Sequence, residues 1–179
     1  KVRQGRRQFR MLALGVHQRL MGMAPEDRPI VLVFGESLGA WSSSDVVMKS
    51  GVEGFDQYSI SRALWFGMPH LAKWSKAGLD RPGAMTPPGT VGVFDRWDEL
   101  EQLSPEARDA LRVVQLSHDN DPITHVDPGI LFREPDWLGE PRGRNVPAGQ
   151  RWFPVVTFVQ TLIDAANAMR NTPGEFRST

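Results

Sequence analysis

The chain has 179 residues, of which 40% are hydrophobic and 23% charged, and its 21 basic residues equal its 21 acidic residues in number. This length corresponds to roughly one domain, and the composition excludes a wholly disordered chain. The balanced charge argues against a dedicated nucleic-acid-binding protein, which usually has a basic excess. There are no cysteines, which excludes a disulfide scaffold, a Cys-ligated zinc site, an iron–sulfur cluster and a thiol nucleophile.

The basic residues are concentrated at the start of the chain. Residues 1–22 contain six basic residues and no acidic one, which leaves 15 basic and 21 acidic residues in the remainder. Apolar residues from Phe9 to Met21 recur near helical spacing, so residues 5–22 are predicted to form an amphipathic helix. Its arginines indicate either a solvated face or a face that meets anions or a membrane. No apolar run reaches the ~20 residues of a membrane-spanning helix, so we expect this piece to be soluble.

Strands alternate with helices along the rest of the chain. Residues 30–34 are five consecutive apolar residues, which predicts a strand covered on both faces in the middle of a parallel sheet. The sequence contains no hairpin turn signal such as Asn-Gly, so we predict an α/β fold with a mainly parallel sheet flanked by helices. The other predicted elements are strands over 62–67, 91–94 and 112–116, helices over 40–48, 97–111 (broken at Ser104-Pro105) and 155–169, and loops over 75–90 and 126–150.

The segment Gly35-Glu36-Ser37-Leu38-Gly39 lies between a predicted strand and a predicted helix. A Gly-x-Ser-x-Gly pattern alone is weak, but this strand–turn–helix setting is that of a nucleophile elbow, where a serine projects from a sharp, strained turn. The two glycines are expected to remove clashes around the turn. The Leu38 N–H is expected to supply half of an oxyanion hole at the helix N-terminus. The alternative is an ordinary capping serine in a glycine-rich connection.

A nucleophilic serine needs a base and an acid that orients the base, and in this fold the acid precedes the histidine along the chain. The strand over 112–116 leads into a polar stretch that contains Asp119 and Asp121. We predict Asp121 as the acid with Asp119 in reserve, and the alternative is that both are turn-capping aspartates. The chain has four histidines: His17, His70, His118 and His125. His118 and His125 flank the acid without a comfortable spacing for the base, and His125 stays open as an alternative base.

Other polar and aromatic residues are candidates for substrate binding. Trp41 lies four residues after Ser37 and could line an apolar acyl pocket or pack in the core. Glu36 and His70 are further pocket candidates, although His70 could have only a loop or capping role. A metal-site interpretation remains an alternative for the cluster His118, Asp119, Asp121, His125 and Asp127, but its spacing matches no known signature. We therefore predict no metal and no other cofactor.

Several segments together resemble a family of membrane-anchored bacterial α/β-hydrolases. The matching segments follow the order of that family: Val33-Phe34-Gly35-Glu36-Ser37-Leu38-Gly39-Ala40, Arg62-Ala63-Leu64-Trp65, His118-Asp119-Asn120-Asp121, Pro135-Asp136-Trp137-Leu138-Gly139 and Thr157-Phe158-Val159-Gln160-Thr161-Leu162. The resemblance implies that a membrane-spanning region and the first strands of the sheet precede this segment. It also implies a Gly-His-Asp-Tyr pattern beyond Thr179 that carries the base histidine.

These observations together predict that residues 1–179 are the C-terminal portion of a single α/β-hydrolase domain. We expect a serine hydrolase of the esterase or lipase type, which acts on an ester or acyl substrate through an acyl-enzyme, with this segment alone inactive. An acyltransferase and a non-catalytic binding module of the same fold are the alternatives. The resemblance implies a lipid or cell-envelope ester as substrate and membrane association through a segment outside this chain. No nucleic-acid partner is expected.

Overall fold

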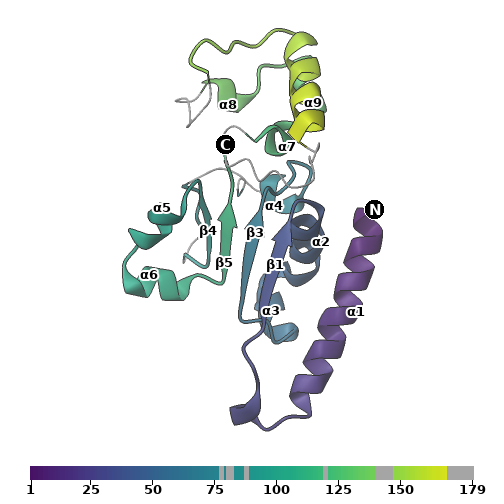
Figure 1. Cartoon of the computed structure of the whole chain (residues 1–179), viewed down its shortest axis with the longest axis vertical. Helices are drawn as coiled ribbons and strands as arrows, with labels where there is room; N and C mark the ends of the chain where they lie inside the picture. Colours follow the sequence, from purple (N-terminus) through teal and green to yellow (C-terminus); the bar gives the residue numbers. More distant parts are fainter. Residues whose placement is uncertain (77–78, 80–82, 87–88, 119–120, 140–146, 169–179) are drawn as a thin grey trace.

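The computed structural model describes residues 1–76, 79, 83–86, 89–118, 121–139 and 147–168. The fold is α/β, as predicted. Its centre is a four-stranded, all-parallel sheet in the order β1-β3-β5-β4, with helices on both sides (Figure 1). The strands are β1 (Leu32–Glu36), β3 (Arg62–Phe66), β4 (Val91–Phe94) and β5 (Val113–Leu116), and a short strand outside this sheet is β2 (Lys49–Val52).

The longest helix, α1 (Val2–Met21), packs along α2 (Leu38–Val47), where Arg6 forms an ion pair with the buried carboxylate of Asp45. The other basic side chains of α1 are exposed. The short elements β2, α3 (Glu53–Gln57) and α7 (Pro122–His125) were not predicted, because four or five residues are too few to show a hydrophobic period. The remaining helical elements are α3 (Glu53–Gln57), α4 (Lys73–Lys76), α5 (Trp97–Glu101), α6 (Pro105–Ala110), α7 (Pro122–His125), α8 (Asp136–Gly139), α9 (Val156–Ala168), η1 (Pro25–Asp27) and η2 (Pro128–Leu131).

The predicted break at Ser104-Pro105 is confirmed, since α5 and α6 are separate helices. The Ser104 hydroxyl accepts a hydrogen bond from the Ala107 N–H at 3.2 Å, and Pro105 occupies the first helical turn. A hydrogen bond from its own backbone N–H, and a second one from Ser104, hold the pKa of Glu106 below its usual value. Both interactions stabilise the N-terminus of α6.

The main core lies on one face of the sheet. Side chains such as Val33, Trp65 and Val93 point to this face and pack against residues of α2 and α3, among them Val47 and Phe55. On the other face, the described residues form a small cluster over β4 and β5, made of Phe94, Leu100 and Leu111 with three partly buried neighbours. The two faces of the sheet are therefore covered to different extents.

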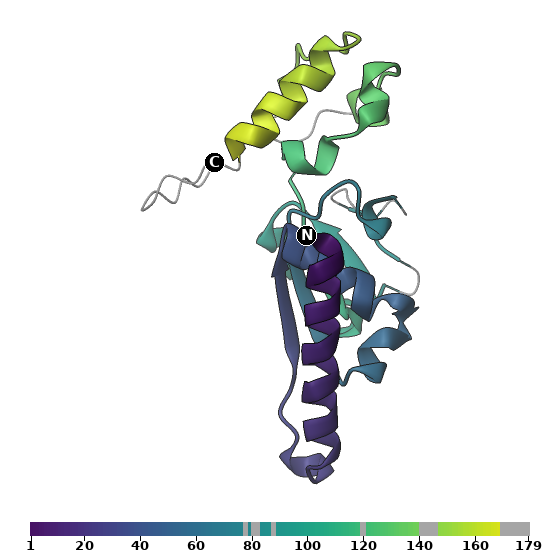
Figure 2. The same ribbon diagram turned by 90° about the vertical axis from the view of Figure 1, so that its right-hand side faces the viewer.

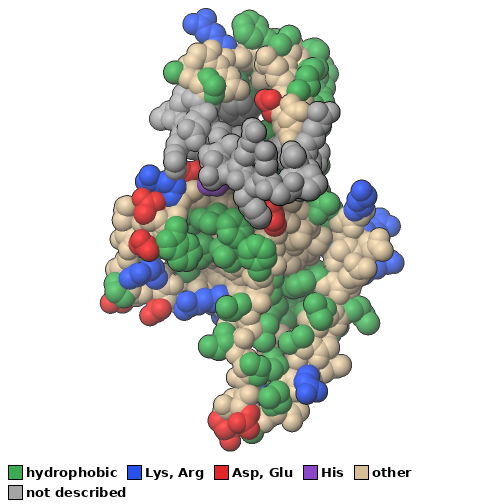
Figure 3. Space-filling model, viewed as in Figure 1, with side chains coloured by type: hydrophobic (Ala, Val, Ile, Leu, Met, Phe, Trp, Pro, Cys, Tyr) green, Lys and Arg blue, Asp and Glu red, His purple; other side chains and the backbone are tan. Residues whose placement is uncertain are grey.

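β1 lies at the edge of the sheet, so the prediction that it is covered on both faces in the middle of the sheet is wrong for the described residues. Leu32 and Phe34 are each 68% exposed, because they point to the face opposite α2. Apolar side chains gather on this face of the molecule (Figure 3). A groove of about 430 Å³ opens beside β1, where its lining includes Phe9, Phe34 and Leu38.

A helical segment lies beyond the carboxyl ends of the strands (Figures 1 and 2). It consists of α7, η2, α8 and α9, in which α9 packs against α7 and η2. Thr157, Thr161 and Ala165 are on the buried side of α9, whereas Val159 and Ile163 are exposed. Within the part of the chain that the structure describes, no helix is both long enough and apolar enough to cross a membrane.

Candidate active site

Ser37 is placed at the turn between β1 and α2, as the sequence pattern predicts. Its backbone has φ 49° and ψ −115°, a conformation that is costly for any residue other than glycine and is often found at functional sites. The Ser37 N–H donates to the Phe66 carbonyl at 3.0 Å, and the Ser37 carbonyl accepts from the Trp41 N–H at 3.0 Å. The chain therefore changes from strand to helix at this single residue, which is the geometry of a nucleophile elbow.

The two glycines of the motif differ in their surroundings. A Cβ on Gly35 would lie 2.8 Å from the Ala40 nitrogen and 2.9 Å from the Ala40 Cα, which are backbone atoms that cannot move aside. A Cβ on Gly39 would meet nothing within 4 Å among the described residues. The expectation that both glycines remove a clash is therefore right for Gly35 and wrong for Gly39, because Gly39 is already on an exposed face of α2.

The variant Gly35→Ala is expected to lower the free energy of unfolding by about 1–3 kcal/mol, since the added methyl group forces the backbone of the elbow apart. The matched variant Gly39→Ala is expected to be neutral or to raise stability by up to ~1 kcal/mol, because alanine favours a helix over glycine. Urea denaturation of the two variants measures the difference. Equal stability losses would show that the close approach of Gly35 to Ala40 is not a constraint on the fold.

Leu38 is the first residue of α2, and its side chain is 44% exposed. Backbone N–H groups in the first turn of a helix have no acceptor within the helix. The Leu38 N–H is thus at the positive end of a ten-residue helix, where negative charge is favoured. Its role in an oxyanion hole stays a prediction.

Asp121 and Ser37 are on the same edge of the sheet. Asp121 caps α7, where one carboxylate oxygen, Oδ1, accepts the Ile123 N–H at 2.9 Å. The other oxygen, Oδ2, would be 3.4 Å from a Cβ on Gly67, the residue that follows β3. Because β3 is the direct neighbour of β1, at a spacing of about 4.8 Å, this carboxylate lies roughly one strand away from the elbow. The reserve candidate Asp119 falls outside the described residues.

The histidines are distributed over several parts of the fold. His17 is on α1 and is hydrogen-bonded to the Ser59 hydroxyl at 2.9 Å. The His70 N–H donates to the Ile123 carbonyl at 3.4 Å, and its Nε2 is 3.8 Å from Asp127. This places His70 beyond β3 and beside α7, near Asp121. His118 is hydrogen-bonded to Asp95, and His125 is the last residue of α7.

The pocket candidates Glu36 and Trp41 flank the elbow. Glu36 is exposed at the end of β1. Trp41 is partly buried and packs against the main core, and its indole nitrogen is buried without a hydrogen-bond partner among the described residues. The contacts of Trp41 thus support core packing, and the substrate contacts of Glu36, Trp41 and His70 stay predictions.

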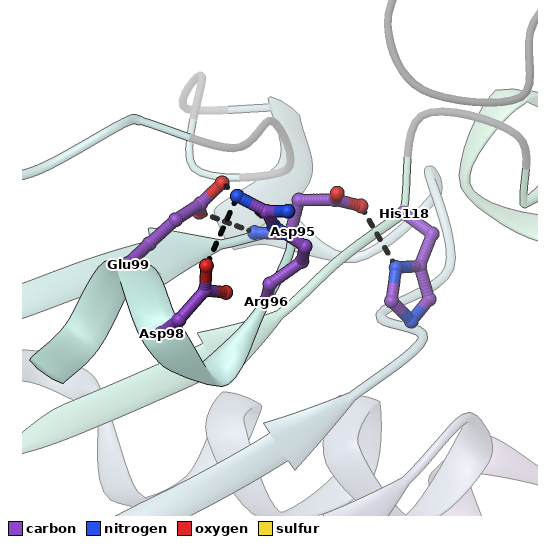
Figure 4. Close-up of polar contacts among 5 residues, drawn as sticks. All are labelled: Asp95, Arg96, Asp98, Glu99 and His118. Carbon is purple, nitrogen blue, oxygen red and sulfur yellow. Dashed lines mark hydrogen bonds and ion pairs between the residues drawn. The ribbon is translucent and has the colours of Figure 1, made fainter.

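One polar residue at this edge was missed by the sequence analysis. Asp95 follows β4 directly, is buried, and its Oδ1 is 2.8 Å from Nδ1 of His118 (Figure 4). The available signal was its position, an aspartate immediately after an apolar strand segment and before a helix. The partner His118 is 23 residues away, so that signal could not identify the pair.

The metal-site interpretation finds no support in the described part of the chain. Within these residues there is no group of three or more side chains of the metal-binding types that could hold an ion. His118 is engaged with Asp95, and Asp127 with His70 and the Gly129 N–H. Asp119, the remaining member of the sequence cluster, lies outside the described residues.

A comparison over the whole chain decides the family. The sequence model of an α/β-hydrolase family matches residues 1–177. The chain belongs to this family. No curated protein and no solved structure matches it. Membership agrees with the parallel sheet and the strand–serine–helix turn, and it supports a hydrolase-type function.

Proposed function

We propose that the protein is a serine hydrolase that cleaves an ester through a Ser-His-Asp triad and an acyl-enzyme. The observation that carries this proposal is the backbone of Ser37, which has a positive φ at the junction of a parallel strand and a helix. Such strain persists only where the surrounding structure enforces it, and the turn at Ser37 brings Gly35 so close to the Ala40 backbone that a Cβ would clash there. An ordinary capping serine would need no such conformation.

The proposed reaction uses the groups at this edge of the sheet. The Ser37 hydroxyl attacks the acyl carbonyl while a histidine outside residues 1–179, which the resemblance implies, takes its proton, and Asp121 orients that histidine. The Leu38 N–H donates a hydrogen bond to the developing oxyanion. The alcohol leaves with the proton from the histidine, and water then releases the acyl group from Ser37.

A fluorophosphonate probe tests the proposal on the full-length protein. We expect covalent labelling at a single serine, and mass spectrometry of the digested protein should locate the label on the peptide that contains Ser37. An unlabelled protein, or a label on another serine, would contradict the assignment of the nucleophile.

We also propose that further strands of the same hydrolase domain pair with the outer edge of β1. The support is that β1 is an edge strand of the described sheet and that Leu32 and Phe34 are exposed on its face. Unpaired edges and exposed apolar patches of this kind mark surfaces that pack against other segments. The resemblance described above adds that these strands precede the present segment. It further favours a lipid or cell-envelope ester as substrate and membrane association of the complete protein.

The variant Phe34→Ala tests the pairing of β1. In a protein of residues 1–179 alone we expect a change in unfolding free energy below about 1 kcal/mol, because the side chain is mostly exposed. In the full-length protein we expect a loss of about 3 kcal/mol or more, since the ring would be buried. Val93→Ala, at a position buried in both forms, is the control and should cost the same in each. Equal small effects of Phe34→Ala in both proteins would argue against added strands.

A further inference from the structure

Asp95 and His118 form a second acid–histidine pair at the edge of the sheet that carries Ser37. Asp95 follows β4 and His118 lies just beyond β5, and Nδ1 of the imidazole is 2.8 Å from Oδ1 of the carboxylate (Figure 4). The side chain of Asp95 is only 11% exposed, whereas that of His118 is 59% exposed. A buried carboxylate thus holds an imidazole that faces solvent.

The contacts of Asp95 fix how the imidazole presents its nitrogens. The Asp95 N–H donates to Glu99 Oε2 at 2.9 Å, and Arg96 is paired with Asp98 and Glu99. Among the described residues, the Asp95 carboxylate contacts the His118 imidazole. Because a carboxylate only accepts hydrogen bonds, Nδ1 of His118 must carry the proton. In the neutral imidazole the opposite nitrogen, Nε2, is then a hydrogen-bond acceptor.

The strand order sets the approximate spacing between the backbone of the nucleophile and the strands that carry this pair. Ser37, Gly67 and Ser117 follow the ends of three adjacent strands, β1, β3 and β5, in register. Two strand spacings separate Ser37 from Ser117, which is about 10 Å between backbones. Gly67 lies between them, and the Asp121 carboxylate is beside it, since Oδ2 would be 3.4 Å from a Cβ on Gly67. His118 and Asp95 are on the far side of this interval, since β4 is the last strand of the sheet.

We propose that His118, oriented by Asp95, accepts a hydrogen bond from a hydroxyl group in the alcohol part of the substrate. This inference rests on the proposed function, because it assumes that the ester carbonyl is bound at Ser37. An alcohol part that spans from the elbow to His118 must be several atoms long and must carry a second hydroxyl. The preferred substrates are therefore esters of a polyol or a sugar, and esters of simple alcohols cannot make this contact.

The experiment compares two esters of the same acid, glyceryl monobutyrate and ethyl butyrate, with the full-length protein. The wild type should prefer the glyceryl ester in kcat/KM by about tenfold, the range of one hydrogen bond to a substrate hydroxyl. His118→Leu should remove this preference through a higher KM for the glyceryl ester, with ethyl butyrate hydrolysis within twofold of wild type. The exposure of His118 makes a folding defect in this variant unexpected.

Asp95→Asn separates positioning from a merely structural role. An asparagine amide can donate to Nδ1, which shifts the proton to Nε2 and changes it from acceptor to donor. The preference for the glyceryl ester should fall as in His118→Leu, and the ¹⁵N spectrum of the imidazole should show the other tautomer. Arg96→Gln is the control, because the Arg96 guanidinium pairs with Asp98 and Glu99, and it should retain the preference.

The outcomes distinguish this inference from the proposed function. If the wild type is labelled by the fluorophosphonate probe at Ser37 but His118→Leu keeps the glyceryl preference, or loses both activities equally, the role of His118 is wrong and the nucleophile stands. If the probe does not label Ser37, the proposed function fails and this inference fails with it.

Discussion

Replacement of Ser37 by alanine is expected to lower kcat for ester hydrolysis by about 10⁶-fold, the loss seen when a triad serine is removed. Alanine lacks the hydroxyl that forms the acyl-enzyme, so only transition-state binding by the remaining groups is left. Labelling by the fluorophosphonate probe should disappear completely. The fold should be retained and stability raised slightly if anything, because the strained turn itself is unchanged apart from one oxygen atom.

Ser104→Ala is the matched control for this variant. Ser104 caps α6 through the Ala107 N–H, so its loss should cost about 1 kcal/mol of stability and leave kcat unaltered. Parallel measurements of turnover and urea denaturation on both variants separate the two effects. Retention of more than a few per cent of wild-type turnover by Ser37→Ala would show that another group is the nucleophile.

The parts of the fold that the sequence predicted are those with a local signal. The strands predicted over 62–67 and 112–116 are observed as the parallel strands β3 and β5. A new helix begins at Pro105, where a capping serine and a proline are adjacent in the sequence. Helix ends moved by one to three residues; for example, the first helix spans Val2–Met21. Short elements such as β2 and α7 were not predicted, because they are too short to show a hydrophobic period and depend on contacts with neighbouring segments.

The errors concern contacts between distant segments. The run from Ile30 to Phe34 suited a strand covered on both faces, but coverage depends on which segments pack there, and β1 is an edge strand with Phe34 exposed. Gly39 was expected to remove a clash as Gly35 does, but of these two glycines only Gly35 lies close to another backbone segment. The pair Asp95–His118 joins two strands that are neighbours only in space.

The elbow is the part of the candidate site that the sequence predicts best. Its residue types, order and position between a strand and a helix are all local, and the backbone of Ser37 has the strain that such a turn requires. Asp121 is different, because its proximity to Gly67 follows from how β5 and α7 pack beside β3.

Asp121→Asn is expected to reduce kcat by about 10⁴-fold with little change in KM, as in triads where the acid becomes an amide. The amide cannot stabilise the imidazolium that forms when the histidine takes the Ser37 proton. Because asparagine caps helices as well as aspartate does, the cap of α7 and the thermal midpoint should be preserved. A loss of activity with an unchanged midpoint would then be a loss of chemistry.

Asp127→Asn is the control for this variant, since Asp127 is a second capping aspartate near the same edge, with its Oδ1 on the Gly129 N–H. We expect its kcat to stay within about threefold of wild type, because no step of the proposed reaction uses it. Asp95→Asn completes the comparison among the carboxylates at the ends of the strands. If Asp95→Asn gives the 10⁴-fold loss and Asp121→Asn does not, Asp121 is not the acid of the triad.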